Sequence, residues 1–302
     1  MLQIKILVFF IGFSCIGFAQ NANNAVNSWS KDALLQHVKT LSSDIFEGRR
    51  TGTKGAVKAK KYIINQFYSS GLKPFKKSFE QPFTFVKGNK TYNASNVLGV
   101  VKGTEHANKY IVISAHYDHE GKKGGQIFNG ADDNASGVSA LFAFAEYFKT
   151  HPPKHSVILA AFDAEELGLR GSKYFVSTSA ISLKNIKLNI NLDMISRSVK
   201  NELFVVGTAF NKTLKQLILG VNTVDDLELK LGHDGEDGLE NWTYASDHAN
   251  FYKNNIPFLY FGVEDHKDYH EPTDDYENIH PEFYKKAVET IMSVFEKTDK
   301  SL

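Results

Sequence analysis

Five short stretches of the sequence carry side chains that bind divalent metals or move protons. The residues are His116 and Asp118 in AHYDH, Asp133 in GADDNASG, Glu165 and Glu166 in DAEELG, Asp193 in NLDM, and His270 in YHEPTD. Imidazole and carboxylate ligands suit Zn²⁺ and similar ions, and a paired site leaves one bound water to attack a carbonyl. The set therefore indicates a two-metal hydrolytic centre.

Most of these residues lie where a predicted strand ends. His116 ends the apolar run KYIVISAH, Glu165 and Glu166 follow SVILAAFD, Asp193 ends IKLNINLD, and His270 lies beyond IPFLYFG. In parallel sheets, ligands bind outside the carboxyl ends of the strands. Polar groups that leave four core strands at one edge would converge in space. A separate helix-capping or ion-pairing role for each acid is therefore the weaker interpretation.

The elements that must position these residues follow a strand-and-helix pattern. Apolar stripes at helical spacing occur within residues 30–72 and 281–297, while residues 77–102 alternate like an antiparallel pair of strands. From residue 109 onward, strands alternate with helices. The predicted fold class is α/β, with a mostly parallel mixed central sheet flanked by helices on both faces. The acidic, weakly patterned segment 225–245 is expected to be a loop near the mouth of the site.

The composition is that of a folded globular protein. Hydrophobic residues make up 42% of the 302 residues, and the formal net charge is +1. There is no basic excess on the scale of a nucleic-acid-binding protein, and the basic runs GRRTGTKG and KAKK are interpreted as solvated surface. We expect one domain over residues 20–302, and we expect this domain to be a monomer.

The first residues are typical of an export signal. Lys5 precedes an apolar run over residues 6–18, and Gly17 and Ala19 supply small side chains at the cleavage position. We expect a signal peptide at 1–19 and an exported protein, periplasmic or secreted, with no membrane segment in its mature form; a retained anchor is the alternative. The single cysteine, Cys15, lies inside this segment, so no disulfide is expected.

Together with the phrase LSSDIFEGRRTGTKG, these motifs resemble peptidase family M28, co-catalytic metallopeptidases that include secreted bacterial aminopeptidases. The resemblance covers nearly all of the chain after residue 19. It implies a zinc-dependent exopeptidase-like, phosphorylase/hydrolase-like form of the α/β fold. It also implies that Asp133 bridges two divalent ions, with zinc as the expected metal. It further implies that His116 and Asp193 complete one ion's shell, and that Glu166 and His270 complete the other's. Manganese or cobalt would also suit such a carboxylate-rich site.

The same resemblance assigns the remaining catalytic roles. Glu165 is expected to act as general base, taking a proton from the metal-bridging water and returning it to the leaving amine. Asp118 is expected to accept the second N–H of His116 and so orient that ligand. Tyr269 matches a position where some relatives place an oxyanion donor, although a packed aromatic ring is the alternative.

Other polar residues are given structural roles. Asp132 is expected to serve in a turn or helix cap, His119 has no role in the family, and Ser246-Asp247-His248 resembles a hydrolase triad in composition only. The remaining histidines are expected on the surface, namely His37, His106, His151, His155, His233, His266 and His280.

The leading functional hypothesis is an aminopeptidase that acts on peptide substrates. A group that binds the free amine is then needed, and Asp193, Glu165, Asp237 and Glu240 are the candidates. The alternatives are glutaminyl cyclisation, which relatives perform with a single zinc, carboxypeptidase action, and a non-catalytic binding protein. The intact ligand set and Glu165 favour the two-metal peptidase.

Overall fold

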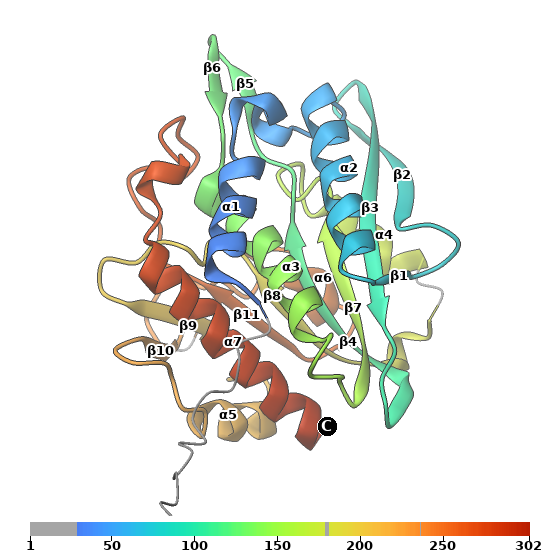
Figure 1. Ribbon diagram of the computed structural model, residues 1–302, viewed down its shortest axis with the longest axis vertical. Helices are drawn as coiled ribbons and strands as arrows, with labels where there is room; N and C mark the ends of the chain where they lie inside the picture. Colours follow the sequence, from blue (N-terminus) through green and yellow to red (C-terminus); the bar gives the residue numbers. More distant parts are fainter. Residues whose placement is uncertain (1–28, 179–180, 236) are drawn as a thin grey trace, which may run out of the picture.

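The computed structural model describes residues 29–178, 181–235 and 237–302 (Figure 1). The predicted signal peptide at 1–19 lies outside the described residues. Within the described part of the chain, no helix is both long and apolar enough to span a bilayer.

Four parallel strands form the centre of the sheet. In their spatial order they are β7 (His155–Phe162), β4 (His106–His116), β8 (Ile186–Leu192) and β11 (Phe258–Gly262). Every residue of β7 is buried. Parallel strands that helices cover on both faces are expected to be continuously apolar in this way. The fold-class prediction of an α/β protein with a mixed central sheet is confirmed.

Antiparallel pairs extend the sheet on both sides. On one side, β3 (Lys90–Val101) pairs with β7, and β2 (Glu80–Lys87) and β1 (Lys73–Pro74) pair with β3. On the other side, β9 (Glu202–Val206) runs antiparallel to β11 and parallel to β10 (Glu228–Leu231). A separate hairpin joins β5 (Gly121–Lys123) to β6 (Gln126–Phe128).

Two sequence expectations are wrong on this second side. The parallel rhythm does not continue to residues 202–206, and the segment 225–245 is not entirely loop, because it contains β10. This edge strand has four residues and none of them is fully buried. An alternation so short and so weakly buried leaves almost no periodic signal in the sequence.

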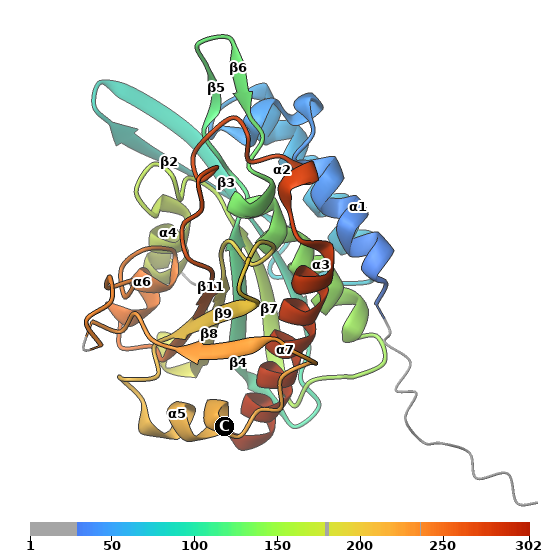
Figure 2. The same ribbon diagram turned by 90° about the vertical axis from the view of Figure 1, so that its left-hand side faces the viewer.

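Helices cover both faces of the sheet (Figures 1 and 2). One face carries α1 (Lys31–Leu41), α2 (Lys54–Ser69), α3 (Gly137–Tyr147) and α7 (Pro281–Ser301), with α5 (Lys212–Leu219) against α7. The opposite face carries α4 (Arg170–Thr178) and α6 (His248–Tyr252). Short turns of tighter or wider helical geometry lie at Asp44–Arg49, Ala131–Ser136, Leu183–Asn185 and Tyr276–Asn278.

The helix α2 shows how residues at its two ends set the boundaries of a helix. The Thr53 side chain accepts a hydrogen bond from the Ala56 N–H and so caps the first turn of α2. Ala59, Ile63 and Phe67 are fully buried along one face. Beyond the helix, Gly71 adopts a φ of 81°, a conformation that glycine tolerates best. The apolar stripe predicted within residues 30–72 is confirmed.

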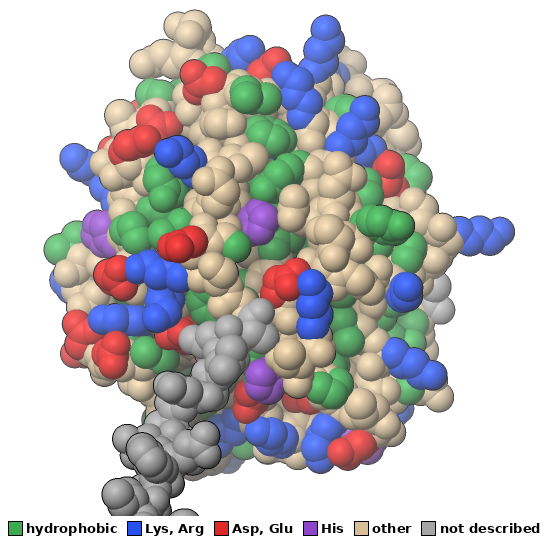
Figure 3. Space-filling view, in the orientation of Figure 1, with side chains coloured by type: hydrophobic (Ala, Val, Ile, Leu, Met, Phe, Trp, Pro, Cys, Tyr) green, Lys and Arg blue, Asp and Glu red, His purple; other side chains and the backbone are tan. Residues whose placement is uncertain are grey.

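Charged side chains are mixed on the face that Figure 3 presents. Lysine and arginine side chains alternate with aspartate and glutamate there, without a large field of one sign. This distribution agrees with the balanced composition of the sequence.

Candidate active site and metal centre

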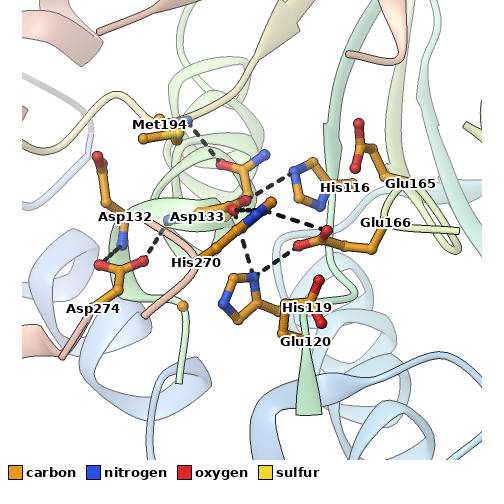
Figure 4. A network of polar contacts seen from close by, with 12 residues as sticks. His116, His119, Glu120, Asp132, Asp133, Glu165, Glu166, Met194, His270 and Asp274 are labelled. Carbon is orange, nitrogen blue, oxygen red and sulfur yellow. Dashed lines mark hydrogen bonds and ion pairs between the residues drawn. The ribbon is translucent and has the colours of Figure 1, made fainter. Parts of the chain in front are cut away.

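The predicted chemical residues converge at the carboxyl edge of the four central strands. All of them except Asp118 line a cavity of about 140 Å³, and Figure 4 shows several of these side chains. Its walls include His116, Asp133, Glu165, Glu166, Asp193, Tyr269 and His270. The expectation that strand ends would bring these side chains together is therefore met by the geometry.

The donor atoms form two groups that share one carboxylate. In the first group, His116 Nε2 lies 3.2 Å from Asp133 Oδ1 and 3.1 Å from Asp193 Oδ1. In the second group, His270 Nε2 lies 3.2 Å from Asp133 Oδ2 and 3.4 Å from Glu166 Oε2. The two oxygens of Asp133 thus face different groups, as a bridging carboxylate requires.

These separations fit the edges of a metal coordination shell. Nitrogen and oxygen ligands at 2.0–2.1 Å from a tetrahedral zinc ion lie about 3.3 Å from one another. Glu166 Oε1 is buried and makes no well-aligned hydrogen bond with the described residues, although His119 Nδ1 lies 3.0 Å away. A buried carboxylate oxygen without a donor is costly unless a cation binds there. The residues of both groups therefore fit divalent ions.

The carboxylates also require compensating positive charge. Burial lowers the pKa of His270, but its contacts with Asp133 and Glu166 outweigh burial and raise this pKa to about 10. Burial raises the pKa of Asp133, yet His119, His116 and His270 together hold it well below its ordinary range. The site consequently stabilises anionic carboxylates next to cations.

The carboxylate of Asp274 fixes the backbone at Asp132 and Asp133. The two oxygens of Asp274 accept hydrogen bonds from the N–H groups of Asp132 and Asp133, both at 3.0 Å (Figure 4). The buried guanidinium of Arg49 donates to the carbonyls of Leu41 and Gly130, each at 2.8 Å. The loop that carries Asp133 is thus held from two sides.

Asp118 makes a different contact from the one predicted. His116 Nδ1 donates to the backbone carbonyl of Asp118 at 3.1 Å, whereas the carboxylate lies 3.9 Å from that nitrogen. A carbonyl can only accept, so His116 Nδ1 carries a proton, and Nε2 is the nitrogen that faces Asp133 and Asp193. The Asp118 carboxylate instead accepts the backbone N–H of Glu165 at 3.0 Å. Sequence reasoning missed this because a backbone partner leaves no mark on residue types.

Glu165 borders the cavity without forming part of either donor group. Burial raises the pKa of its carboxyl well above the ordinary value, and Asp193 adds to this although His116 opposes it. A carboxylate with a raised pKa can both take up and return a proton near neutral pH.

Tyr269 stacks on the ring of His270, with ring centroids 4.0 Å apart. Burial raises the pKa of its phenol above the ordinary value, and the negative charges of Asp133 and Asp193 raise it further. The phenol therefore keeps its proton and can donate it in a hydrogen bond.

Asp132 lies in the turn Ala131–Ser136, one of the two roles expected for it, but its side chain does not cap a helix. One of its oxygens accepts both the N–H and the hydroxyl of Ser196, at 2.8 and 2.7 Å, and the other lies 3.1 Å from His266 Nε2. Asp132 is fully buried. It therefore ties the segment after β8 to the segment that carries Asp133.

His119 is a residue whose place in the site the sequence analysis missed. Its side chain is fully buried, and its Nδ1 lies 3.0 Å from Glu166 Oε1 and 3.6 Å from Asp133 Oδ2 (Figure 4). Two histidines three residues apart in AHYDH were the available signal. The adjacent Glu120 also approaches Glu166 and His270, but its carboxylate is paired with Arg50 at 3.1 Å.

The Ser246-Asp247-His248 sequence does not form a triad. Ser246 Oγ accepts a hydrogen bond from Asn191, and His248 Nε2 lies 2.9 Å from the Trp242 carbonyl. His248 also stacks against Tyr260 in the cavity wall, with centroids 4.5 Å apart.

The surface expectation is wrong for two of the remaining histidines. His155 and His233 are 2% and 1% exposed. His155 is buried because Asp299 of α7 accepts its backbone N–H and contacts its ring nitrogen, both at 2.9 Å. His233 is buried because its ring stacks on Trp242 with centroids 3.5 Å apart.

Two acidic residues extend the cavity beyond the donor groups. Glu240 and Asp265 both line it. The other candidate from this region, Asp237, does not line it, since its carboxylate accepts the backbone N–H groups of His233 and Leu239.

Comparison with known proteins places this site in a family. The sequence profile of peptidase family M28 matches residues 96–295. Aminopeptidase YwaD of Bacillus subtilis is 29% identical over 225 residues, which are 68% of this chain and 45% of that protein. The chain spans about half the length of this relative and of the alkaline phosphatase isozyme conversion protein of Escherichia coli.

Solved structures share the fold. A Zn-dependent exopeptidase from Parabacteroides distasonis superposes with a TM-score of 0.71 at 19% identity, covering 89% of this chain and 98% of the other. A glutaminyl cyclase from Bacteroides thetaiotaomicron gives the same TM-score, identity and coverage. At such identities the likeness concerns the fold alone.

Proposed function

This chain belongs to peptidase family M28, and from that premise we propose that it is a two-zinc aminopeptidase. The observation that carries the proposal is the position of Asp133 between two donor groups. One oxygen lies 3.2 Å from His116 Nε2, and the other lies 3.2 Å from His270 Nε2. A single carboxylate can hold two cations together in this way.

The chemistry follows from the residues around that carboxylate. Zinc ions held by the two groups would polarise a substrate carbonyl and lower the pKa of water towards about 7. Glu165 is positioned to take a proton from the attacking water and to pass it to the leaving amine. The hydrogen bond from the Glu165 N–H to Asp118 fixes the backbone from which this base extends.

Tyr269 supplies a neutral donor in the same cavity. Its raised pKa keeps the hydroxyl protonated at physiological pH. We propose that this hydroxyl donates to the carbonyl oxygen as negative charge develops on it, when the donation is strongest.

The proposal that the enzyme acts on the N-terminal end of a peptide rests on the negative charge that lines the cavity. Glu240 and Asp265 line it together with the donor groups. A substrate ammonium group would be attracted to these carboxylates, whereas a C-terminal carboxylate would be repelled. Trp242, Tyr260 and Val263 form an apolar part of the wall that suits an uncharged first side chain.

Glutaminyl cyclisation is the competing activity, because a cyclase shares this fold. The complete pair of donor groups favours hydrolysis.

A panel built on one peptide tests the choice. The purified zinc-loaded protein is assayed with the free, N-acetylated and C-amidated forms of this peptide, and with a separate peptide that begins with glutamine. We expect release of the first residue from the free and amidated forms and no cleavage of the acetylated form. Equal cleavage of the acetylated form would contradict aminopeptidase action. Loss of cleavage on amidation would indicate a carboxypeptidase, and pyroglutamate formation would indicate a cyclase.

We further propose that residues 1–19 direct export and are removed, leaving residues 20–302 as one monomeric catalytic domain that acts outside the cytoplasm. N-terminal sequencing of the protein from periplasmic and culture fractions tests cleavage after Ala19, and light scattering of that material tests the monomer. An intact N-terminus in the cytoplasmic fraction would contradict export.

A further inference from the structure

We infer that His119 binds the second metal ion. The other side-chain ligands of this ion would be Glu166, His270 and the bridging Asp133. This inference rests on the proposed two-zinc function. The ligand set that the family resemblance implies contains one histidine for each ion and does not include His119. The geometry places two imidazoles on the second ion.

The first observation is an unsatisfied pair of buried atoms. His119 Nδ1 and Glu166 Oε1 lie 3.0 Å apart, yet neither has a hydrogen-bond partner among the described residues. The donor and acceptor directions are therefore misaligned, although the distance is short. Two ligand atoms of one metal ion lie close together without a hydrogen bond between them, because the lone pair of each atom points at the ion and not at the other atom.

The second observation is the match to a coordination shell. The His119 Nδ1 distances of 3.0 Å to Glu166 Oε1 and 3.6 Å to Asp133 Oδ2 bracket the tetrahedral edge of about 3.3 Å. His270 Nε2 approaches the same two carboxylates at 3.2 and 3.4 Å. Both imidazoles thus face the same pair of carboxylates.

The third observation is that the ring of His119 is held in place. The ring packs directly on Gly130, where an added Cβ would lie 2.6 Å from its Cγ and Cδ2 atoms. Gly130 has a φ of 58°, and its carbonyl is held by Arg49. The ring is fully buried, so no solvent competes for its nitrogens. The nearby Glu120 is a poorer ligand because Arg50 and Lys123 already neutralise it.

A consequence is that the two ions differ. Four side chains, Asp133, Glu166, His270 and His119, would bind the second ion, whereas three, Asp133, His116 and Asp193, would bind the first. The ion of His116 and Asp193 would keep an open position.

Anomalous diffraction at the zinc edge from crystals of the zinc-loaded wild-type protein tests the assignment directly. We expect His119 Nδ1 about 2.1 Å from one zinc ion. A distance above about 3 Å, as for a residue that only hydrogen-bonds to Glu166, would overturn the inference and leave the proposed function intact. Absence of zinc from the cavity would overturn both.

Zinc titration with a competing chelator provides the test in solution. In His119→Gln, we expect one of the two binding steps to weaken at least about 100-fold, while the other changes by less than about threefold. His155→Gln is the matched control, because it also removes a buried histidine but lies at the other end of β7 from the site. Unchanged zinc affinity in His119→Gln would overturn the inference. Circular dichroism of the metal-free variants checks that each is folded.

Discussion

The carboxylate of Asp118 holds Glu165 by its backbone: Oδ1 accepts the Glu165 N–H at 3.0 Å. The same carboxylate lies 3.0 Å from the hydroxyl of Thr51, and neither contact includes His116. Replacement of Asp118 should therefore disturb the base more than it disturbs the ligand His116.

For Asp118→Asn, we expect kcat to fall about 10-fold or more while zinc content stays at the wild-type value. The neutral asparagine side chain accepts a weaker hydrogen bond from the Glu165 N–H than the carboxylate does. The backbone carbonyl of residue 118, which orients His116, remains. Metal analysis and steady-state kinetics on the same preparation measure both quantities. Loss of zinc in proportion to the loss of activity would contradict this account and restore a direct role in orienting His116.

Tyr269→Phe removes one hydroxyl and keeps the ring that stacks on His270. If the hydroxyl donates to the developing oxyanion, kcat should fall by about 10²-fold while KM changes little. Tyr244→Phe is the control, because that ring is 53% exposed and does not line the cavity. Wild-type kcat in Tyr269→Phe would show that the residue is only a packed aromatic.

Removal of zinc should lower thermal stability. Without cations, the buried carboxylates of Asp133, Glu166 and Asp193 repel one another. In general, a ligand at a concentration a thousandfold above its dissociation constant stabilises the folded protein by about 4 kcal/mol. We expect the Tm to fall by about 8 °C or more on chelation and to recover with zinc. Asp133→Asn should lose most of this response. An unchanged Tm on chelation would argue against bound metal.

Arg49→Met should destabilise the protein by about 3 kcal/mol or more. The guanidinium is 1% exposed and donates to four backbone carbonyls, which would lose their donors. Arg50→Met is the matched control. Its partly exposed side chain pairs with Glu120, and we expect a cost below about 1 kcal/mol. Urea unfolding measures both variants, and equal stabilities would contradict the role given to Arg49.

The sequence predicted the central strands and the convergence of their polar ends, because burial on both faces leaves apolar runs that stop at polar residues. His116 and Asp193 could be placed in this way, since each lies at the end of such a run or directly after it. The short edge strand β10 could not, because four partly exposed residues carry no periodicity.

The contacts around the site were harder to predict. His119 lies beyond the end of β4, where the direction of a side chain does not follow strand alternation. The proton on His116 is fixed by a backbone carbonyl, and His155 is buried by an aspartate 144 positions away. Neither type of partner is visible in the local residue pattern.

Zinc stoichiometry and turnover in wild-type protein and in Glu165→Gln test the central claim most directly. Glutamine keeps the shape of the side chain but cannot take a proton, and general-base catalysis contributes about 10²–10⁴-fold. The account predicts two zinc ions per chain in both proteins, and turnover in Glu165→Gln reduced by at least about 100-fold. Wild-type turnover in Glu165→Gln, or full turnover in protein stripped of metal, would contradict it.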